Sequence, residues 1–207
     1  MEKKLFAIVL LLLSTLYIHA DEDTPNAKQA RRIFDIAYNQ VFGKEGSRLD
    51  YNVNIIGIYK TKGTIWLKEK KQRFKDNRVT SWNDGTTVYV ANKKKHTVEI
   101  HDSKANKSDK HSSRFKFTLD DFTYSISKES DGLLLTLKQK KKAKGTIKEV
   151  RALVTPKTYE PIRLRIKVAF VWTTIHISNF QAGDIQDDIF TFPVEQYKSG
   201  WKFVDKR

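Results

Sequence analysis

The sequence has 207 residues, of which 39% are hydrophobic and 12% aromatic, and its 39 Lys and Arg outnumber 24 Asp and Glu for a formal net charge of +15. This composition excludes an intrinsically disordered chain, and the length fits one domain of roughly 100 to 200 residues. The absence of cysteine excludes disulfides and a lipid attached to an N-terminal Cys. The positive charge favours an anionic neighbour, although a Lys-rich surface also keeps a β-rich protein soluble.

The N-terminus has the pattern of a secretory signal peptide. Lys3 and Lys4 precede an apolar run from Leu5 to Ile18, and Ala20 stands before an acidic cluster that begins at Asp21. The run is too short to span a bilayer, and a small residue marks the cleavage position. We therefore expect a signal peptide at 1–20 and one mature domain at 21–207, located in the periplasm. Export directs the basic charge toward head groups, lipopolysaccharide or acidic proteins and away from nucleic acid.

The start of the mature chain predicts one amphipathic helix, which ends near Gly43. Thr24 is a suitable N-cap and Pro25 suits the first helical position. Apolar residues then recur at spacings of three and four, which predicts one face that another element must cover. These residues are Ala30, Ile33, Phe34, Ala37, Tyr38, Val41 and Phe42.

From Leu49 onward the period of the apolar residues changes from 3.6 to 2. A slip in the alternation near Gly57 predicts a β-bulge. Asn83-Asp84-Gly85 is typical of a tight hairpin turn. The series of short strands predicts an antiparallel sheet or barrel, with further strands at about 64–69, 72–81, 86–92, 96–102, 122–128, 132–139, 146–154, 161–168 and 171–180.

Two stretches do not follow the alternating pattern. Residues 104–113 are polar and Lys-rich, which predicts a loop. The stretch from Phe115 to Phe122 fits a strand through Phe115, Phe117 and Leu119, and it equally fits one face of a short helix through Phe115, Leu119 and Phe122.

The chemistry-bearing residues do not form an enzyme-like pattern. On a strand, Glu99 and His101 share a face whereas His96 points away, so the three cannot converge on a metal. The adjacent acids Asp120-Asp121 and Asp187-Asp188 diverge in the same way and favour turns or caps. No nucleophile elbow, phosphate-binding glycine loop or metalloprotease helix is present in the sequence. We expect no enzyme activity, no cofactor and no metal.

The surplus of large apolar side chains needs another explanation. Four Trp, eight Tyr and twelve Phe accompany a single well-marked helix. A concave sheet that holds a lipid-sized cavity would use these residues, and an ordinary packed core beneath the helix would also use them.

Several stretches, taken in order, resemble LolA, the periplasmic carrier of lipoproteins. Gly63–Lys68 is similar to the family's Gly-x-apolar-Trp-apolar-Lys strand, and Phe74 falls near its aromatic strand. Asn83–Asn92 resembles its Asp-Gly hairpin, and the run from Ile177–Phe180 to Ile189–Pro193 resembles its closing strands with Phe-x-Phe-x-Pro. The resemblance covers most of the mature chain.

This resemblance implies a mainly β fold with an α lid (α+β): a strongly curved antiparallel half-barrel over the N-terminal helix and a short helical lid, with a hydrophobic cavity for acyl chains between them. It also implies an inner-membrane donor complex and an outer-membrane acceptor as partners. Two departures stand out. Proteobacterial members have an Arg after Lys68 that holds the lid shut, whereas this chain has Glu69, and the polar stretch 106–113 leaves only 115–122 for further lid helix. We expect lid control to differ.

We therefore expect a monomeric carrier of lipoproteins or other acyl lipids. The candidate cavity residues are Ile33, Phe34, Trp66, Phe74, Tyr89, Phe115 and Phe122. The candidates for docking head groups or an acidic partner are Lys68, Lys70, Lys71 and Arg73. The alternative is a basic envelope protein that binds anionic lipid, lipopolysaccharide or an acidic partner protein through charge; its binding would collapse with salt.

Overall fold

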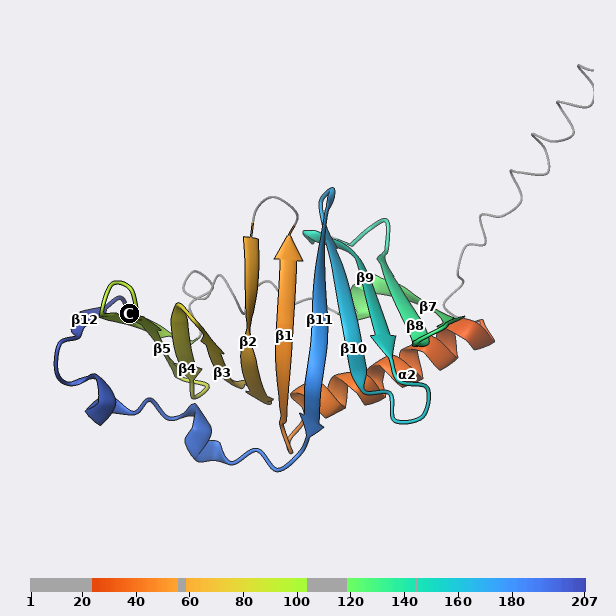
Figure 1. Cartoon of the computed structure of the whole chain (residues 1–207). Helices are drawn as coiled ribbons and strands as arrows, with labels where there is room; N and C mark the ends of the chain where they lie inside the picture. Colours follow the sequence, from red (N-terminus) through yellow and green to blue (C-terminus); the bar gives the residue numbers. More distant parts are fainter. Residues whose placement is uncertain (1–23, 56–58, 104–118, 144) are drawn as a thin grey trace, which may run out of the picture.

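A computed structural model of the chain describes residues 24–55, 59–103, 119–143 and 145–207. The described part holds one α-helix, α2 (Pro25–Phe42), and one continuous sheet of twelve strands (Figure 1). The strands are β1 (Ser47–Ile55), β2 (Tyr59–Lys68), β3 (Lys71–Asp76), β4 (Val79–Asn83), β5 (Thr87–Asn92), β6 (Thr97–Asp102), β7 (Phe122–Glu129), β8 (Gly132–Gln139), β9 (Ile147–Val154), β10 (Pro161–Val168), β11 (Val171–Ala182) and β12 (Lys202–Asp205). Short 3-10 turns occupy Leu119–Asp121 (η2), Asp187–Phe190 (η3) and Val194–Tyr197 (η4).

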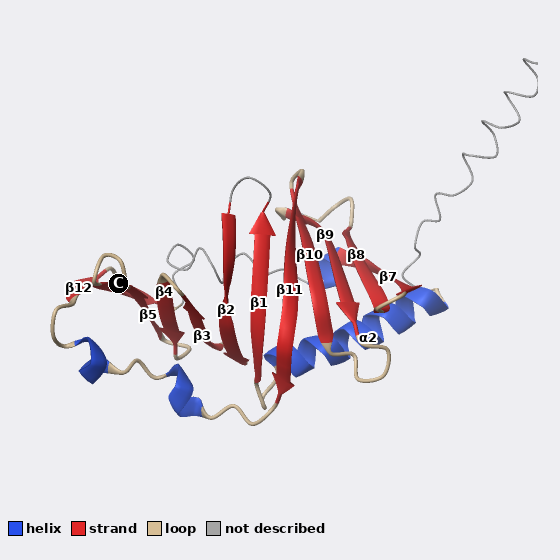
Figure 2. Cartoon of the chain, viewed as in Figure 1, coloured by secondary structure: helices blue, strands red, loops and turns tan. Residues whose placement is uncertain are grey.

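The strands form a single open, curved layer (Figure 2). Their order is β12-β6-β5-β4-β3-β2-β1-β11-β10-β9-β8-β7, and every pair is antiparallel except β12 with β6. Two meanders, β1–β6 and β7–β11, are therefore joined side by side where β1 pairs with β11. The mainly β, α+β class with an open curved sheet is confirmed. We call the sheet face that α2 covers the inner face and the opposite face the outer face.

Helix α2 agrees with its prediction at both ends. The Thr24 Oγ1 accepts a hydrogen bond from the backbone N–H of Ala27 at 3.1 Å, and Pro25 opens the helix. At the other end the Gly43 N–H donates to the Asn39 carbonyl at 2.8 Å. A Cβ at Gly43 would lie 2.3 Å from that carbonyl oxygen, so glycine is required here by close approach.

Most predicted strands are present, and one is divided. The stretch 72–81 forms β3 and β4, because the buried Asp76 ends β3 and its Oδ1 accepts from the N–H groups of Arg78 (2.7 Å) and Val79 (2.6 Å). Such a carboxylate-capped turn stops a strand in spite of its alternating pattern. The predicted bulge at Gly57 lies outside the described residues; a register shift between β1 and β11 occurs between Arg48 and Asp50.

The two irregular stretches fall largely outside the described residues. Nothing is described for 104–118, which includes Phe115 and the predicted loop at 104–113. Leu119–Asp121 forms η2, and Phe122 opens β7. The predicted hairpin turn is confirmed: the Asp84 Oδ1 accepts from the N–H groups of Thr86 and Thr87, both at 2.8 Å, and Gly85 has a φ of 96°.

The C-terminal segment packs on the outer face, which the sequence pattern did not predict. After β11 the chain runs back along the β1–β5 half of the sheet and ends in β12, which pairs with β6 (Figure 1). Phe192 stacks on Tyr89 with ring centroids 4.4 Å apart and meets Trp82 edge-on at 5.2 Å. Together with Ala91 and Val98 these rings form a second, smaller core. The segment therefore acts as a cover for β4–β6.

Replacing Phe192 with Ala should lower the free energy of unfolding by about 3 kcal/mol, because it empties the centre of this second core. Chemical denaturation measures the loss, and limited proteolysis should show faster cleavage after residue 183. Val194→Ala, at a position that is 48% exposed, is the control and should change little. A Phe192→Ala variant as stable as its control would show that the segment does not hold the sheet.

Candidate functional site

The inner face of the sheet is apolar across its whole β7–β1 half. Because strand side chains alternate in direction, β1 sends Leu49, Tyr51 and Val53 to this face. The neighbouring strands contribute the buried side chains Tyr124, Leu135, Leu137, Val150, Ile166 and Ile175. A broad hydrophobic surface results, and an amphipathic helix is needed to cover it.

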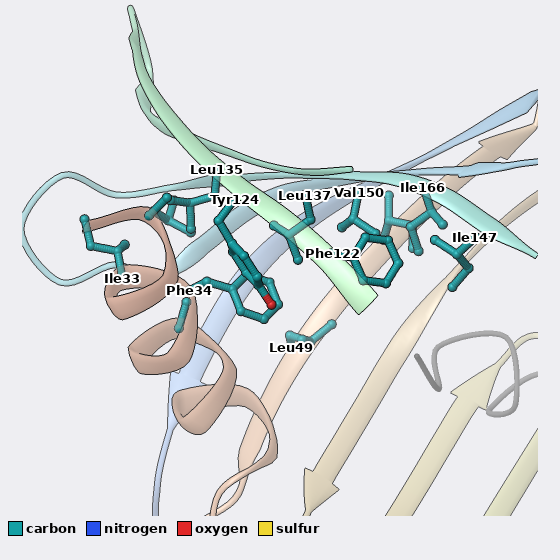
Figure 3. Close-up of a cluster of buried hydrophobic side chains, with 14 of the residues drawn as sticks. Ile33, Phe34, Leu49, Phe122, Tyr124, Leu135, Leu137, Ile147, Val150 and Ile166 are labelled. Atoms are coloured by element: carbon teal, nitrogen blue, oxygen red, sulfur yellow. The ribbon is translucent and has the colours of Figure 1, made fainter. Parts of the chain in front are cut away.

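Helix α2 covers this surface with its apolar stripe. Figure 3 shows Ile33 and Phe34 pointing from the helix toward Tyr124 and Leu135. The Phe34 ring meets the Tyr124 ring edge-on, with centroids 5.8 Å apart. Full burial of a side chain such as Ile33 or Phe34 contributes about 1.5–3 kcal/mol, so this contact is what holds α2 on the sheet.

Polar contacts fix the N-terminal half of α2 to the edge strand β7. Asn26 bonds the backbone of Ile126 twice: its Nδ2 donates to the carbonyl at 2.9 Å, and its Oδ1 accepts from the N–H at 3.0 Å. Arg31 pairs with Asp35 and with Asp120 of η2, each at 3.0 Å, and its guanidinium lies 5.0 Å from the Tyr124 ring centroid. These bonds also occupy a sheet edge that would otherwise be open to strand pairing.

Burial beneath α2 changes the ionisation of Tyr124. Loss of solvent raises the pKa of Tyr124 to about 12, while the nearby Arg31 charge acts in the opposite direction. The phenol therefore stays neutral at physiological pH and donates to the Leu119 carbonyl at 2.9 Å. This bond links η2 to the same core that α2 covers.

The C-terminal half of α2 is also held by polar contacts, and the first is a hydrogen bond from the Ser47 Oγ to the Val41 carbonyl at 2.8 Å. The Gln40 Nε2 donates to the Thr158 carbonyl at 2.8 Å, and the Glu69 N–H donates to the Phe42 carbonyl at 3.1 Å. Glu69 occupies the β2–β3 turn with a φ of 51°, and its side chain is exposed. The position where the LolA resemblance expects a lid-holding Arg thus lies at the end of α2 and contributes a backbone bond.

The apolar inner face continues past the edge of α2. Val53, Ile65 and Phe74 of β1–β3 pack against the core and remain partly exposed. The Phe74 ring stacks on the Tyr51 ring with centroids 5.5 Å apart and an interplanar angle of 22°. We call Val53, Ile65 and Phe74 the apolar fringe.

The candidate cavity residues lie on two faces of the sheet. Ile33, Phe34 and Phe122 are buried in the core beneath α2, and Phe74 belongs to the fringe. Trp66 and Tyr89 lie on the outer face. In the strand register Trp66 stands opposite Arg73, Arg73 opposite Trp82, and Trp82 opposite Tyr89, so all four side chains point to the same face. Phe115 lies outside the described residues. The structure therefore brings together four of the seven residues and separates Trp66 and Tyr89 from them.

The candidate head-group residues are partly occupied by contacts within the chain. The Lys68 Nζ donates to the Ile185 carbonyl at 2.8 Å and pairs with Asp187 at 3.0 Å, and Lys71 pairs with the same carboxylate at 2.7 Å. Both contacts lower the pKa of Asp187, and the hydrogen bond from Lys71 has the larger effect. Lys70 is exposed in the turn. Lys68 and Lys71 thus attach the C-terminal segment to β2 and β3.

Arg73 belongs to a ladder of cations and rings on the outer face. Its guanidinium lies 5.0 Å from the Trp66 ring centroid and 5.6 Å from that of Trp82, and Arg48 lies 5.9 Å from Trp66 on the other side. Burial lowers the pKa of Arg73. Cation–π contacts of this kind stabilise the sheet surface. Alternation places Arg73 and Phe74 on opposite faces, but the contacts with Trp66 and Trp82 also depend on the register of β2, β3 and β4.

Several of the histidines and acids singled out in the sequence form ion pairs and turn contacts. His101 Nε2 lies 3.2 Å from the Glu99 Oε2, as their shared face predicts, and Glu99 also pairs with Lys206 at 2.8 Å. Nowhere in the described ranges do three His, Asp or Glu side chains gather for a metal. Asp120 and Asp187 serve in ion pairs at 3-10 turns, in agreement with the turn role predicted for both acidic pairs.

Two grooves border α2, and each is lined by both polar and apolar residues. One, of about 710 Å³, lies between the helix and the start of β7 and is lined by residues that include Arg31, Asp35, Asp120 and Lys140. The other, of about 920 Å³, lies at the end of the helix beside Glu69 and Gly183. No helix in the described part of the chain has the length and apolarity that crossing a membrane requires.

Comparison with known proteins gives relationships at the level of fold. No protein-family model and no curated protein matches the sequence. An uncharacterized conserved protein from Thermus thermophilus aligns with a TM-score of 0.59 over 86% of this chain and 99% of its own, at 8% identity. This solved structure shows that the fold occurs elsewhere; so low an identity concerns the fold alone.

Two further solved structures align with lower TM-scores. A LolA superfamily protein from Nitrosomonas europaea aligns over 80% of this chain and 98% of its own, with a TM-score of 0.40 and 10% identity. A domain from Vibrio parahaemolyticus, named for outer membrane lipoprotein sorting, aligns over 84% of this chain and 100% of its own, with a TM-score of 0.42 and 10% identity.

Replacing Asn26 with Ala should loosen the start of α2, because both bonds to the Ile126 backbone are lost. The site is exposed, so we expect a cost of about 1 kcal/mol together with faster amide exchange in the first turns of α2. Hydrogen exchange measures the amide exchange rates, and chemical denaturation measures the cost in stability. Asn39→Ala, at an exposed position of the same helix, is the control. Equal exchange rates in the two variants would show that the Asn26 bonds do not hold the helix.

Replacing Asp50 with Asn should destabilise the sheet in a pH-dependent way. Hydrogen bonds from Asn179 first and then Thr64 lower the pKa of Asp50, and the Arg48 charge adds to this although burial opposes it. A lowered folded-state pKa stabilises the protein above the unfolded-state value and ceases to do so as pH falls through the folded value. Denaturation should therefore show a loss of about 1 kcal/mol at pH 7 that shrinks toward pH 2.

The exposed Asp188 provides the control for this prediction. Asp188→Asn should leave stability unchanged at both pH values. A loss in Asp50→Asn that stays the same from pH 7 to pH 2 would contradict the ionic origin of the effect.

Proposed function

We propose that this chain is a carrier that shields acyl chains on the inner face of its sheet, with lipoproteins as its principal cargo. The observation that supports this best is the apolar fringe, which continues the buried core beyond the area that α2 covers. An acyl chain laid across Val53, Ile65 and Phe74 would extend a hydrophobic contact that already exists.

The energetics suit transport. Each methylene that leaves water contributes about 0.8 kcal/mol, so eight covered methylenes gain about 6 kcal/mol before the cost of ordering the chain. Binding of that order is reversible. A membrane or an acceptor that covers more of the same chain would remove it without any bond chemistry.

Helix α2 is the element that would adjust to cargo. Its N-terminal half is tied to β7 and η2 by Asn26 and Arg31, and its C-terminal half is held by bonds from Gln40, from the Ser47 hydroxyl and from the Glu69 backbone, which would have to break for this half to move. Movement of the C-terminal half would widen the inner face beside the fringe and leave the N-terminal contacts in place. In this proposal α2 serves as the lid, hinged at its β7 end.

The setting of the proposal is the cell envelope. Removal of residues 1–20 would release a monomeric domain that begins at Asp21 into the periplasm, where it would receive lipoproteins from an inner-membrane complex and deliver them to an outer-membrane acceptor. N-terminal sequencing of the exported protein tests the first of these steps.

The charge-driven alternative has its own supporting observation. Arg48, Arg151, Arg165 and Lys167 lie on the outer face, and among them the acids Asp50 and Glu149 are engaged with Arg48 and Arg151. Binding through these cations should weaken steeply with salt, whereas acyl-chain binding on the inner face should survive about 0.5 M salt.

A pair of neighbouring substitutions on β3 tests the carrier proposal. Phe74→Gln removes an aromatic surface from the inner face, while Lys75→Gln changes the exposed residue next to it, which points to the outer face. We expect Phe74→Gln to weaken binding of a soluble diacylated peptide about tenfold or more, and Lys75→Gln to leave it unchanged. Fluorescence titration with a labelled peptide measures both.

The melting transitions of both variants must remain cooperative for the comparison to stand. Ile65→Gln, at the paired position on β2, provides a second inner-face variant. If the wild-type protein binds no diacylated peptide, or if both inner-face variants bind as the wild type does, the carrier proposal is wrong.

A further inference from the structure

The β10–β11 hairpin ends in an exposed apolar tip. Val168 pairs with Val171, so Ala169 and Phe170 form the turn between the two strands. Phe170 is 94% exposed, and Val168 and Val171 are 41% and 50% exposed. These are three of the six large hydrophobic side chains that are exposed in the described part of the chain. The tip therefore concentrates exposed apolar surface at one end of the sheet, at the top in Figure 1.

Behind the tip lies a tryptophan surrounded by cations. The Trp172 ring centroid is 4.8 Å from the Arg165 guanidinium, 5.0 Å from that of Arg151 and 5.8 Å from the Lys167 ammonium. Glu149 is the acid beside them, and it pairs with Arg151 at 2.7 Å. Arg165 and Lys167 retain net positive charge next to the apolar tip.

More cations stand at the same end of the sheet. The Ala169 N–H donates to the Thr146 carbonyl at 3.3 Å, which places the β8–β9 connection beside the tip. This connection and the start of β9 carry Lys140, Lys141, Lys142 and Lys148. The opposite ends of β1 and β11 carry both signs of charge: the acids Glu45, Asp184, Asp187 and Asp188 lie near the cations Lys44, Lys68, Lys70 and Lys71.

We propose that the β10–β11 tip docks the protein on a bilayer that contains anionic phospholipids. In this docking mode, Phe170 with Val168 and Val171 enters the boundary between head groups and acyl chains. Trp172 lies at head-group level, where its ring suits an environment that is apolar on one side and wet on the other. Arg165, Lys167 and the β8–β9 lysines contact lipid phosphates.

The exposed apolar tip and the cations beside it together favour an anionic bilayer as the binding partner. An acidic protein would need an apolar pocket, and a nucleic acid an unstacked base, at the one point where Phe170 projects, whereas a bilayer offers apolar depth beside its phosphates everywhere on its surface. A bilayer uses both, since apolar insertion and attraction to anionic lipid add in the same contact.

Docking by this tip is independent of acyl-chain binding on the inner face. The tip is the turn of a hairpin on the far side of β1 from the fringe residues Ile65 and Phe74. The docking proposal therefore goes beyond the carrier function, and either proposal can be wrong while the other is right.

Vesicle sedimentation tests the proposal with two kinds of tip variant. The wild-type protein should bind vesicles of phosphatidylcholine and phosphatidylglycerol at about 0.1 M salt, and pure phosphatidylcholine vesicles far less. Phe170→Ser should weaken binding to the anionic vesicles about tenfold. The double variant Arg165→Gln/Lys167→Gln should weaken it about fivefold for each charge removed.

Matched controls change the same chemistry elsewhere. Val194→Ser alters a 48% exposed apolar side chain on η4, and Lys44→Gln/Lys70→Gln removes two exposed charges at the other end of the sheet. Both should bind vesicles as the wild type does. Trp172 fluorescence provides a direct readout: brominated lipids should quench the wild type more than Trp172→Phe.

Three results would overturn the proposal. The first is failure of the wild type to bind anionic vesicles. The second is unchanged binding by Phe170→Ser while the charge variant loses binding, because this marks a charge-only site for an acidic macromolecule. The third is a loss in the control variants equal to that in the tip variants. Failure of the carrier proposal looks different: Phe74→Gln should keep vesicle binding, and Phe170→Ser should keep binding of soluble diacylated peptide.

Discussion

The structure depends on one geometric constraint: a single continuous sheet sends alternate side chains of every strand to opposite faces, and both faces must find stable surroundings. Neighbouring residues therefore differ in role. Ile65 packs against the core beneath α2, while Trp66 lies among arginines on the outer face. Phe74 and Arg73 repeat this division on the next strand. Because the division is set by strand register, a slip of one residue would exchange the two faces and destroy both.

The two faces are covered on different halves of the sheet. Helix α2 covers the inner face from β7 to β1, and the C-terminal segment with Phe192 covers the outer face of β4–β6. Each half thus becomes a two-layer structure with its own core, and β1–β3 form the transition between them. The apolar fringe lies in this transition, where the cover of α2 ends. The same arrangement leaves the outer face of β9–β11 uncovered by either element, and there the surface is basic.

Much of the fold could be predicted from the sequence because local signals agree with the final structure. Thr24, Pro25 and the spacing of Ile33 and Phe34 define α2, and alternation defines most strands. The sequence did not show that Trp66 and Phe74 lie on opposite faces of the sheet. Alternation identifies both as strand residues, but it does not say which strands pair or in which register. Asp76 divided a strand through a turn that depends on a buried carboxylate. The position of Phe192 depends on contacts with residues about a hundred positions earlier, and the local pattern holds no signal for such contacts.

The pairing of β1 with β11 has a kinetic consequence. Most ladders join neighbours in the chain and can form as hairpins, but this one joins Ser47 to Ala182 at the centre of the sheet. Closing so large a loop carries an entropic cost that local hairpins avoid, and folding slows as the separation of contacting residues grows. The β1–β6 meander can therefore form early, while the β7–β11 meander and the molecule as a whole wait for the last quarter of the chain. Until β11 has been synthesised and paired, one long side of β1 stays open, and the unfinished chain remains a substrate for chaperones that recognise exposed strands.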